Sequence, residues 1–492
     1  MATQKIVWNT KFKSIWDKSF YTIDFNIHKT ITEQEKHRKN VIENESSLTE
    51  NEKRLLINEI QKGYDALRIG NNSVEKQQCN NCLNWHQAIQ YCEFCIRKYL
   101  ENNFGKWSSG NNEIDKLIKE CQQKATKPDR VIEWIEYDRF ENIEHLADGG
   151  YATVYTAILK DGCYDKWNSK NQTLERLGKQ KIVLKRLNKS NSNVNNVNWF
   201  QEVTLSFTLD STSAFLAAFY GLTKDPETQD YMLVLNYYQT DLKHFLKNNY
   251  QSLTLLQKYR IILHVSISLD KIHDQKIMHR DLHSGNILYT DWYISDFGLS
   301  GPVDKPINSI YGNLPYIPPE ILRQKDYTTK SDVYSLGIIM WEVITGETPF
   351  GNHKCNSNSD FAVAIICGYR PKIYKDIPEE YATLMKQCWD AFPDNRPVAY
   401  EVYEKMRLLI QSLYNEKNLN TQISKDIKSK ISKDTKSKIY RSQSSKVHTF
   451  NISIQPRNAT DEQQLALSFG KFEFEISEEI QQHFLKSIGA ND

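Results

Sequence analysis

The chain has 492 residues, of which 39% are hydrophobic and 25% are charged, and its formal net charge is +2. This length exceeds the roughly 100–200 residues of a typical domain, so we expect more than one structural unit. The small net charge argues against a chain-wide electrostatic attraction to nucleic acid or to anionic membranes.

The N-terminal residues carry scattered lysines and no long apolar core, which is unlike a secretory signal. The longest apolar-rich run, 334–344, is shorter than the roughly 20 residues that span a bilayer. We therefore expect a cytoplasmic protein without membrane contact, and access to the nucleus stays open. In a reducing compartment its nine cysteines would be thiols or metal ligands.

Composition and pattern divide the chain into six segments. These are a polar helical region (1–75), a cysteine element (76–100), a helical linker (101–130), a large domain (131–412), a basic low-complexity segment (413–449) and a C-terminal tail (450–492). In the first segment, Thr49 and Glu52 form a capping box that predicts a helix start. Apolar residues then recur at helical spacing at Leu56, Ile60, Tyr64 and Leu67.

The cysteine element has the pattern C-x2-C-x9-C-x2-C, formed by Cys79, Cys82, Cys92 and Cys95. Four thiolates in two close pairs suit one tetrahedral zinc ion, which would be structural because no coordination position stays open for water. The stretch between the pairs is shorter than is common, and His86 within it is an alternative ligand. Four reduced, half-buried thiols are the alternative interpretation.

The large domain changes its pattern along its length. After a helix predicted by apolar residues between 114 and 121, strand patterns dominate from residue 131 for about a hundred residues, and helical patterns follow to residue 412. This order predicts an α+β fold with a β-rich lobe and an α-helical lobe, preceded by a small helical and zinc-knuckle region.

Two short motifs in the large domain carry a family resemblance. Residues 279–286 read His-Arg-Asp-Leu-His-Ser-Gly-Asn, and Asp296-Phe297-Gly298 follows. Together they resemble the catalytic and magnesium loops of the protein kinase superfamily. The sequence of the first motif is most similar to that of the tyrosine kinase-like group, and in particular to that of a kinase-like family expanded in root-symbiotic fungi. The resemblance implies a bilobal kinase fold.

The resemblance also implies roles for individual residues. Asp281 would orient the substrate hydroxyl, Lys185 and Glu202 would position ATP, and Asn286 and Asp296 would hold Mg²⁺. The remaining nucleotide contacts would come from Leu146, Ala147, Gly149, Gly150, Val154, Leu235 and Tyr238.

The glycine-rich loop departs from the family pattern, because Ala147 and Ala152 stand where two glycines are usual. Each added methyl group restricts the backbone that approaches phosphate. We expect a stiffer clamp on ATP, since the lysine and the metal ions supply larger electrostatic contributions.

Other positions match the family's scaffold. Glu320, which follows Pro318-Pro319, would pair with Arg396, and Asp332 belongs to the signature of the helical lobe. The resemblance covers more than half of the chain.

The C-terminal residues have a different composition. The sequence ISKDIKSK at 423–430 is nearly repeated at 431–438, and residues 423–446 hold eight Lys or Arg against two Asp. We interpret this stretch as a solvated spacer rather than a nucleic-acid contact. Alternating apolar residues predict short strands at 450–454 and 472–476.

The sequence thus predicts an ATP-dependent protein kinase, with serine and threonine favoured over tyrosine as the acceptor. Its partners would be ATP and a protein substrate, and its oligomeric state stays open. The alternative is a pseudokinase that binds nucleotide and serves as a scaffold, which the alanine-substituted loop favours. A zinc-containing nucleic-acid binder is a minor third hypothesis, because basic and aromatic residues are not interleaved.

Overall fold

A computed structural model describes most of the chain. The described residues are 9–25, 27–69, 71, 74–148, 152–188, 190, 203–204, 216–289, 292–296, 309–351, 357–419, 446–450, 452, 454–460, 463–464 and 467. They fall into two compact units. One contains residues 1–241, 288–303 and 403–426, and the other contains residues 242–287, 304–402 and 427–492.

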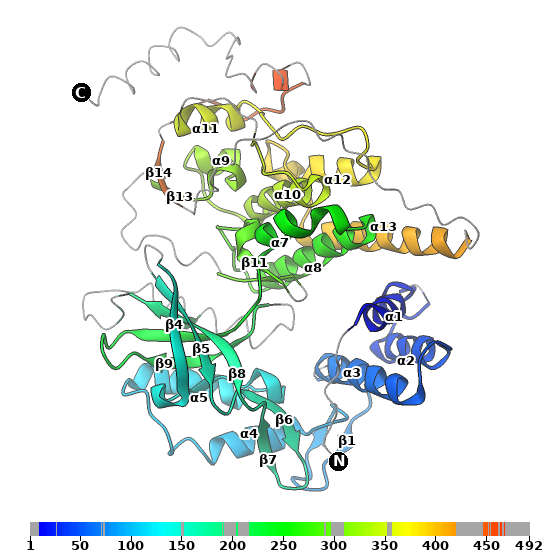
Figure 1. The fold of residues 1–492 in the computed structure, drawn as a ribbon, viewed down its shortest axis with the longest axis vertical. Coiled ribbons are helices and arrows are strands. Elements are labelled where there is room, and N and C mark those ends of the chain that lie inside the picture. The colour runs from blue at the N-terminus through cyan, green and yellow to red at the C-terminus, as the bar shows by residue number, and fades with distance from the viewer. Residues whose placement is uncertain are drawn as a thin grey trace. The chain divides into compact units, whose positions relative to one another are not determined.

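Within residues 131–412, the elements follow the predicted order of mainly strands and then mainly helices (Figure 1). The helices are α1 Thr10–Tyr21, α2 Ile31–Glu43, α3 Glu50–Arg68, α4 Glu93–Glu101, α5 Asn112–Gln123, α7 Leu242–Asn249, α8 Leu255–Asp274, α9 Pro319–Leu322, α10 Thr329–Thr345, α11 Asn358–Ile366, α12 Glu379–Cys388 and α13 Ala399–Leu419. The strands are β1 Gln77–Gln78, β2 Trp85–His86, β3 Glu133–Trp134, β4 Phe140–Asp148, β5 Ala152–Leu159, β6 Tyr164–Asn168, β7 Thr173–Arg176, β8 Gln180–Leu187, β9 Phe219–Lys224, β10 Tyr231–Asn236, β11 Ile287–Leu288, β12 Tyr293–Ile294, β13 Ser309–Gly312 and β14 Lys446–Thr449.

Helix α3 begins at the predicted capping box. The Thr49 side chain accepts a hydrogen bond from the Glu52 backbone, and the Glu52 carboxylate accepts one from the Thr49 backbone. Leu56, Ile60 and Tyr64 are buried against α1 and α2, as their spacing predicts. Leu67 is 53% exposed, so the apolar buried face of the helix ends at Tyr64.

A six-stranded sheet forms the core of the first unit, in the order β3-β9-β10-β8-β5-β4. All its pairs are antiparallel except β3 with β9. One face buries Ile182 and Leu184 of β8 against Phe140 and neighbouring residues. On the other face, Ile114 and Ile118 of α5 pack against the sheet, so the segment expected to be a linker contributes to this core.

The second unit is built around α10. Nearly all residues of this helix are buried, from Ser331 to Thr345. A helix that is buried on all sides is typical of the centre of a helical core, and α8 and α12 pack against it. The β-sheet unit and the helical unit together confirm the predicted α+β fold.

The tail differs from its prediction. Its strand, β14, ends at Thr449. Phe450, Ile452 and Ile454 of the strand predicted at 450–454 are not in a strand, and Asn451 and Ser453 lie outside the described residues. Strand β14 pairs with β13, which lies beside it in Figure 1. The lysine-rich repeat at 423–438 and the strand predicted at 472–476 lie outside the described residues, and α13 continues to Leu419, past the expected domain end at 412.

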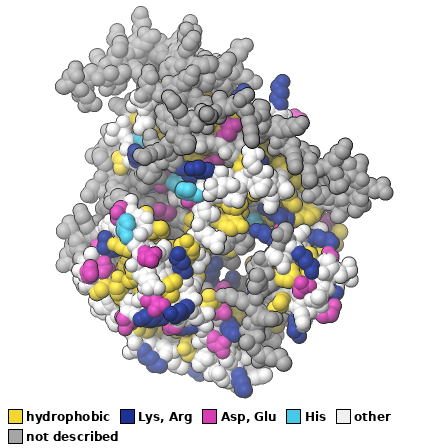
Figure 2. Space-filling view, in the orientation of Figure 1, with side chains coloured by type: hydrophobic (Ala, Val, Ile, Leu, Met, Phe, Trp, Pro, Cys, Tyr) yellow, Lys and Arg dark blue, Asp and Glu magenta, His cyan; other side chains and the backbone are white. Residues whose placement is uncertain are grey.

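The described surface shows charges of both signs. On the face in Figure 2, Lys and Arg side chains are interspersed with Asp and Glu side chains. Within the described part of the chain, no helix combines the length and the apolarity needed to cross a membrane.

Candidate active site

One row of residues crosses the sheet and includes the predicted ATP lysine. Ala147 pairs with Val154, Val154 pairs with Lys185, and Lys185 pairs with Leu233. Because paired residues of antiparallel strands point to the same face, these side chains share one side of the sheet. The sheet therefore places the apolar Val154 beside Lys185 on the same face.

Lys185 also meets the predicted magnesium ligand. Its Nζ lies 3.0 Å from Asp296 Oδ1, and the two side chains are 11% and 36% exposed. Asp296 follows β12, which is held by hydrogen bonding between Ala217 and Ile294. The backbone of Asp296 has a φ of +55°, a left-handed conformation that is uncommon for a residue other than glycine. Such conformations cluster at functional sites, where surrounding structure maintains them.

In the helical unit, Asp332 fixes the loop that carries Asp281. Its carboxylate accepts hydrogen bonds from the backbone of His279 at 2.8 Å and of Arg280 at 2.9 Å, and it contacts His273 Nε2 at 2.9 Å. Asp332 is 1% exposed. Buried carboxylates are stable when their oxygens accept several hydrogen bonds, so Asp332 anchors the loop to α10.

The loop is also held in an unusual backbone conformation. Arg280 has a φ of +68°, and its carbonyl accepts a hydrogen bond from the Tyr327 hydroxyl at 2.7 Å. Burial raises the pKa of Tyr327 well above its ordinary value, with nearby carboxylates including Asp332 and Asp281 adding to the shift. Tyr327 therefore stays a neutral hydrogen-bond donor to the loop.

Asp281 and Asn286 lie together. The Asn286 side-chain nitrogen donates to the Asp281 carbonyl at 2.9 Å, which directs the amide group toward the same loop. His283 Nε2 lies 3.9 Å from Asp281 Oδ2, and His283 Nδ1 accepts from the Gly285 backbone. A small hollow next to Asp281 is lined by residues of the loop, by Gly312 at the end of β13 and by residues that follow it, including Asn313, Ile317 and Tyr327.

A buried hydrogen-bond network, which the sequence did not predict, also holds the loop that carries Asp281. Glu342 of α10 accepts hydrogen bonds from Ser284 Oγ at 2.9 Å and from the Tyr316 hydroxyl at 2.8 Å. Burial, with the Glu342 charge, raises the pKa of Tyr316 well above its ordinary value. The three residues join the catalytic loop, the segment after β13 and α10. The sequence signal was a glutamate within the apolar-rich run 334–344.

The predicted pair of Glu320 and Arg396 forms. Both guanidinium nitrogens donate to the carboxylate at 2.7 Å, and both side chains are buried. Ser331 Oγ donates to the same carboxylate at 3.0 Å. Two parallel charge-assisted hydrogen bonds are the strongest arrangement for such a pair, so it fixes the end of the segment that leads from β13 into α9.

The structure describes three more of the residues predicted to contact the nucleotide, which are Leu146, Leu235 and Tyr238. Leu146 is 57% exposed. Leu235 of β10 pairs with Val183 of β8 and packs at the edge of the apolar cluster between α5 and the sheet. The Tyr238 hydroxyl accepts a hydrogen bond from the Ala218 backbone at 3.1 Å, which turns its ring toward β9. Glu202, Gly149 and Gly150 lie outside the described residues.

The four cysteines converge. The Sγ atoms of Cys79, Cys82, Cys92 and Cys95 all lie within 4.8 Å of one another. The Sγ atoms of Cys79 and Cys95 are 3.6 Å apart, and so are those of Cys82 and Cys92. This is far longer than the roughly 2.05 Å of a disulfide and close to the about 3.8 Å edge of a zinc–sulfur tetrahedron with 2.3 Å bonds. His86 is buried outside this group.

The environment of the cysteines differs from one to another. Burial alone would raise the pKa of the Cys82 thiol, but hydrogen bonds from the backbone and side chain of Asn84 lower it to about 7. Burial raises the pKa of Cys95 to about 11. The cluster packs on the β6–β7 hairpin, where Asn81 donates to Gln172 at 2.5 Å. The donor set and its spacing fit a structural zinc ion.

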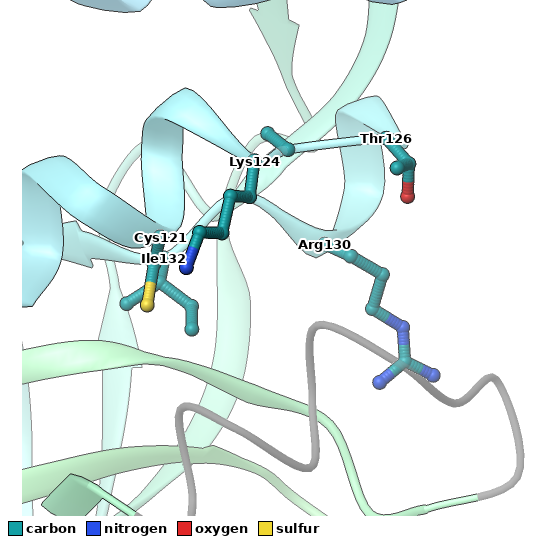
Figure 3. A pocket seen from close by; sticks show the side chains of 6 residues that line it. Cys121, Lys124, Thr126, Arg130 and Ile132 are labelled. Carbon is teal, nitrogen blue, oxygen red and sulfur yellow. The ribbon is translucent and has the colours of Figure 1, made fainter.

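A further hollow lies at the C-terminal end of α5. Figure 3 shows Lys124 beside Cys121 and Ile132, with the Arg130 side chain extending away from them. The lining contains none of the predicted catalytic residues, and it is too small for a ligand larger than a water molecule.

Comparison with known proteins adds independent findings. Residues 140–406, more than half of the chain, match the family described as protein tyrosine and serine/threonine kinase. The chain is 26% identical over 318 residues to a probable LIM domain-containing serine/threonine-protein kinase of Dictyostelium discoideum, covering 63% of this chain and 48% of the relative.

Two other relatives come from the same organism. The stress-activated protein kinase alpha is 30% identical over 228 residues, 43% of this chain and 35% of the relative. The dual specificity protein kinase pyk3 is 27% identical over 316 residues, 62% of this chain and 21% of the relative. The chain thus spans less than half the length of these relatives. Each is named as a kinase, which favours the catalytic interpretation over the pseudokinase alternative.

Proposed function

This chain belongs to the protein tyrosine and serine/threonine kinase family, and on that premise we propose that it transfers the γ-phosphate of ATP to serine and threonine hydroxyls of a protein substrate. The observation that carries the proposal is the 3.0 Å pair between Lys185 and Asp296, because it joins two residues 111 positions apart that the family uses for nucleotide and metal binding. A purely structural sheet has no need of a paired ammonium and carboxylate on this face.

Lys185 would neutralise the ATP phosphates, and its neighbour on the sheet, Val154, would contact the adenine. Asp296 and Asn286 offer the oxygen ligands that Mg²⁺ prefers. When bound, Mg²⁺ would supply positive charge that stabilises the transferring phosphoryl group. Asp296 is held in place by Lys185, and Asn286 by its hydrogen bond to the Asp281 carbonyl.

Asp281 would accept the hydrogen bond of the substrate hydroxyl and orient its oxygen toward the phosphate. Its loop is held by two backbone hydrogen bonds to Asp332, so its position is fixed before substrate arrives. Such preorganisation is a large part of catalysis by positioned groups. His283, close to the Asp281 carboxylate, stands where serine/threonine kinases usually carry a lysine.

The proposed preference for serine and threonine rests on one motif and on the names of two relatives. The wording of residues 279–286 resembles the tyrosine kinase-like group, and in particular the family expanded in root-symbiotic fungi, whose members commonly act on these hydroxyls. Two of the relatives above are named as a serine/threonine-protein kinase and a dual specificity protein kinase. We therefore propose placement in that group, with tyrosine as a lesser acceptor.

We also propose that Cys79, Cys82, Cys92 and Cys95 bind one structural zinc ion. The ion would hold the cysteine element (76–100) against the β6–β7 hairpin. Cys92 and Cys95 already pack there in an apolar cluster with Trp167 and Leu174. Four sulfur ligands exclude a bound water, so no catalytic chemistry is assigned to it.

A phosphoryl-transfer assay tests the proposed function. The purified full chain is incubated with labelled ATP and Mg²⁺ on casein and on a library of Ser-, Thr- and Tyr-containing peptides, followed by phosphoamino acid analysis. We expect Mg²⁺-dependent label on serine and threonine. Saturable ATP binding without any transfer would instead favour the pseudokinase.

A further inference from the structure

Strand β14, from the C-terminal part of the chain, pairs with the edge of β13. Ser309 pairs with Thr449, Ile310 with His448, Tyr311 with Val447 and Gly312 with Lys446, all antiparallel. The two strands are separated by more than 130 residues of sequence and lie side by side in Figure 1. An exposed strand edge is a template for any extended peptide, because its backbone groups need partners. Here the chain supplies the partner itself.

The occupied edge lies next to the catalytic carboxylate. A Cβ atom at Gly312 would be only 3.5 Å from Asp281 Oδ1. Gly312 also lines the small hollow beside Asp281. A strand paired with Gly312 therefore lies beside Asp281, where an extended substrate would present its hydroxyl.

The side chains of the tail are suited to this position. His448 and Phe450 are buried, whereas Val447 before them and Thr449 between them are exposed, which is the alternation of a strand with one covered face. His448 Nε2 donates to the Gly312 carbonyl at 3.2 Å, and the His448 and Phe450 rings stack at 5.5 Å. The Phe450 carbonyl accepts a hydrogen bond from the Gln324 side chain.

Residues after the strand hold it to the helical unit. The Arg457 backbone donates to Ile366 at 3.1 Å, and Gln464 accepts from the Arg370 backbone at 2.8 Å. Gly368, with a φ of +97°, packs so closely that a Cβ there would lie 2.5 Å from the tail backbone. The tail is thus attached at a second place, distinct from β13.

We propose that residues 446–450, which we call the tail strand, act as a built-in competitor for an extended polypeptide substrate, covering the β13 edge beside Asp281 and restraining phosphoryl transfer until they are displaced. This inference rests on the proposed kinase function. Because the tail strand belongs to the same chain, its effective concentration is of the order of millimolar, so even a weak contact stays filled.

The test uses the tail peptide as the probe. A fluorescent peptide KVHTFNI, matching Lys446–Ile452, is titrated by anisotropy into the full-length wild type and into the variant His448→Ala/Phe450→Ala. These substitutions remove the buried side chains of the tail strand without altering β13. The variant should bind the peptide at least about tenfold more tightly than the wild type, because its edge is vacated. Val447→Ala, on the exposed side of the same strand, should behave as the wild type.

Hydrogen exchange gives a second measurement that does not depend on activity. The amides of 309–312 should exchange slowly in the wild type and faster in the double variant, while those of α10 stay equally protected in both, which shows that the fold is intact. Equal peptide binding by the two proteins, or unchanged exchange at 309–312, would overturn the proposal.

Activity then separates the two hypotheses. With casein as substrate, the double variant should show a several-fold higher kcat/KM than the wild type, and added KVHTFNI peptide should compete with casein but not with ATP. If the double variant captures the peptide and neither protein transfers phosphate, the docking contact stands and the proposed kinase function is wrong. If both proteins transfer phosphate with equal kcat/KM, the restraint by the tail is wrong and the kinase function stands.

Discussion

The Lys185 ammonium and the Asp296 carboxylate form a 3.0 Å ion pair in the β-sheet unit. We expect Lys185→Met to lower kcat/KM for ATP by about 10²–10³-fold, the usual effect of removing one positioned charge from a transition state. Lys179→Met is the matched control, because Lys179 directly precedes the same strand, is exposed and pairs only with Glu141 at the surface. Steady-state kinetics with varied ATP would reveal the difference. Similar kinetics for both variants would exclude a role for Lys185 in binding phosphate.

Asp332 is predicted to act by positioning the catalytic loop. Replacing it with asparagine turns one of its acceptor oxygens into a donor that faces the backbone N–H groups of His279 and Arg280. We expect kcat to fall at least tenfold with little change in KM for ATP, and the free energy of unfolding to fall by about 1.5–3 kcal/mol. Kinetics and urea denaturation measure the two effects. A loss of stability with unchanged kcat would mean that Asp332 has only a structural role.

The buried pair of Glu320 and Arg396 should matter mainly for stability. Arg396→Met leaves the Glu320 carboxylate buried with Ser331 as its remaining partner, which should cost about 3–5 kcal/mol. The double variant Glu320→Leu/Arg396→Met should lose less than the sum of the two single changes, because neither charge is then left unpaired. Urea unfolding of the four proteins forms a double-mutant cycle. Additive losses would show that the two side chains are not coupled.

The cysteine cluster predicts a metal content of one zinc ion per chain. Cys82→Ser/Cys95→Ser removes one sulfur from each pair and should abolish the bound zinc, whereas Cys121→Ser, outside the cluster, should retain it. Mass spectrometry of metals in the purified proteins measures the content. Because the ion would be structural, chelation should lower the melting temperature of the wild type. Wild-type protein without bound metal would support four reduced thiols instead.

Local sequence signals predicted several features correctly. The Thr49 and Glu52 capping box depends only on residues three positions apart, and the structure confirms the helix start. The α+β fold followed from the order of strand and helix patterns, and the Glu320–Arg396 pair followed from the family resemblance. In each case the physical requirement is either local or encoded in a motif.

Features that depend on distant partners were not predicted correctly. The tail alternates apolar residues at Phe450, Ile452 and Ile454, but the strand that forms is Lys446–Thr449, because those residues pair with β13. Leu67 continues the helical spacing of α3 but lies outside the cluster that buries Leu56, Ile60 and Tyr64, and it is exposed. The Glu342 network joins three segments that are far apart in sequence, and no short pattern reveals which polar groups would satisfy a buried glutamate.

The most direct test of the proposed chemistry is the rate of phosphate transfer by Asp281→Asn. The substitution keeps the size of the side chain and removes the charge that would orient the substrate hydroxyl, so at saturating ATP and Mg²⁺ we expect transfer to casein to fall by about 10²–10⁴-fold. Asp274→Asn, an exposed aspartate paired with Lys271 at the end of α8, should keep the wild-type rate. Equal transfer by the wild type and Asp281→Asn would contradict the assignment of Asp281, and with it the proposed mechanism.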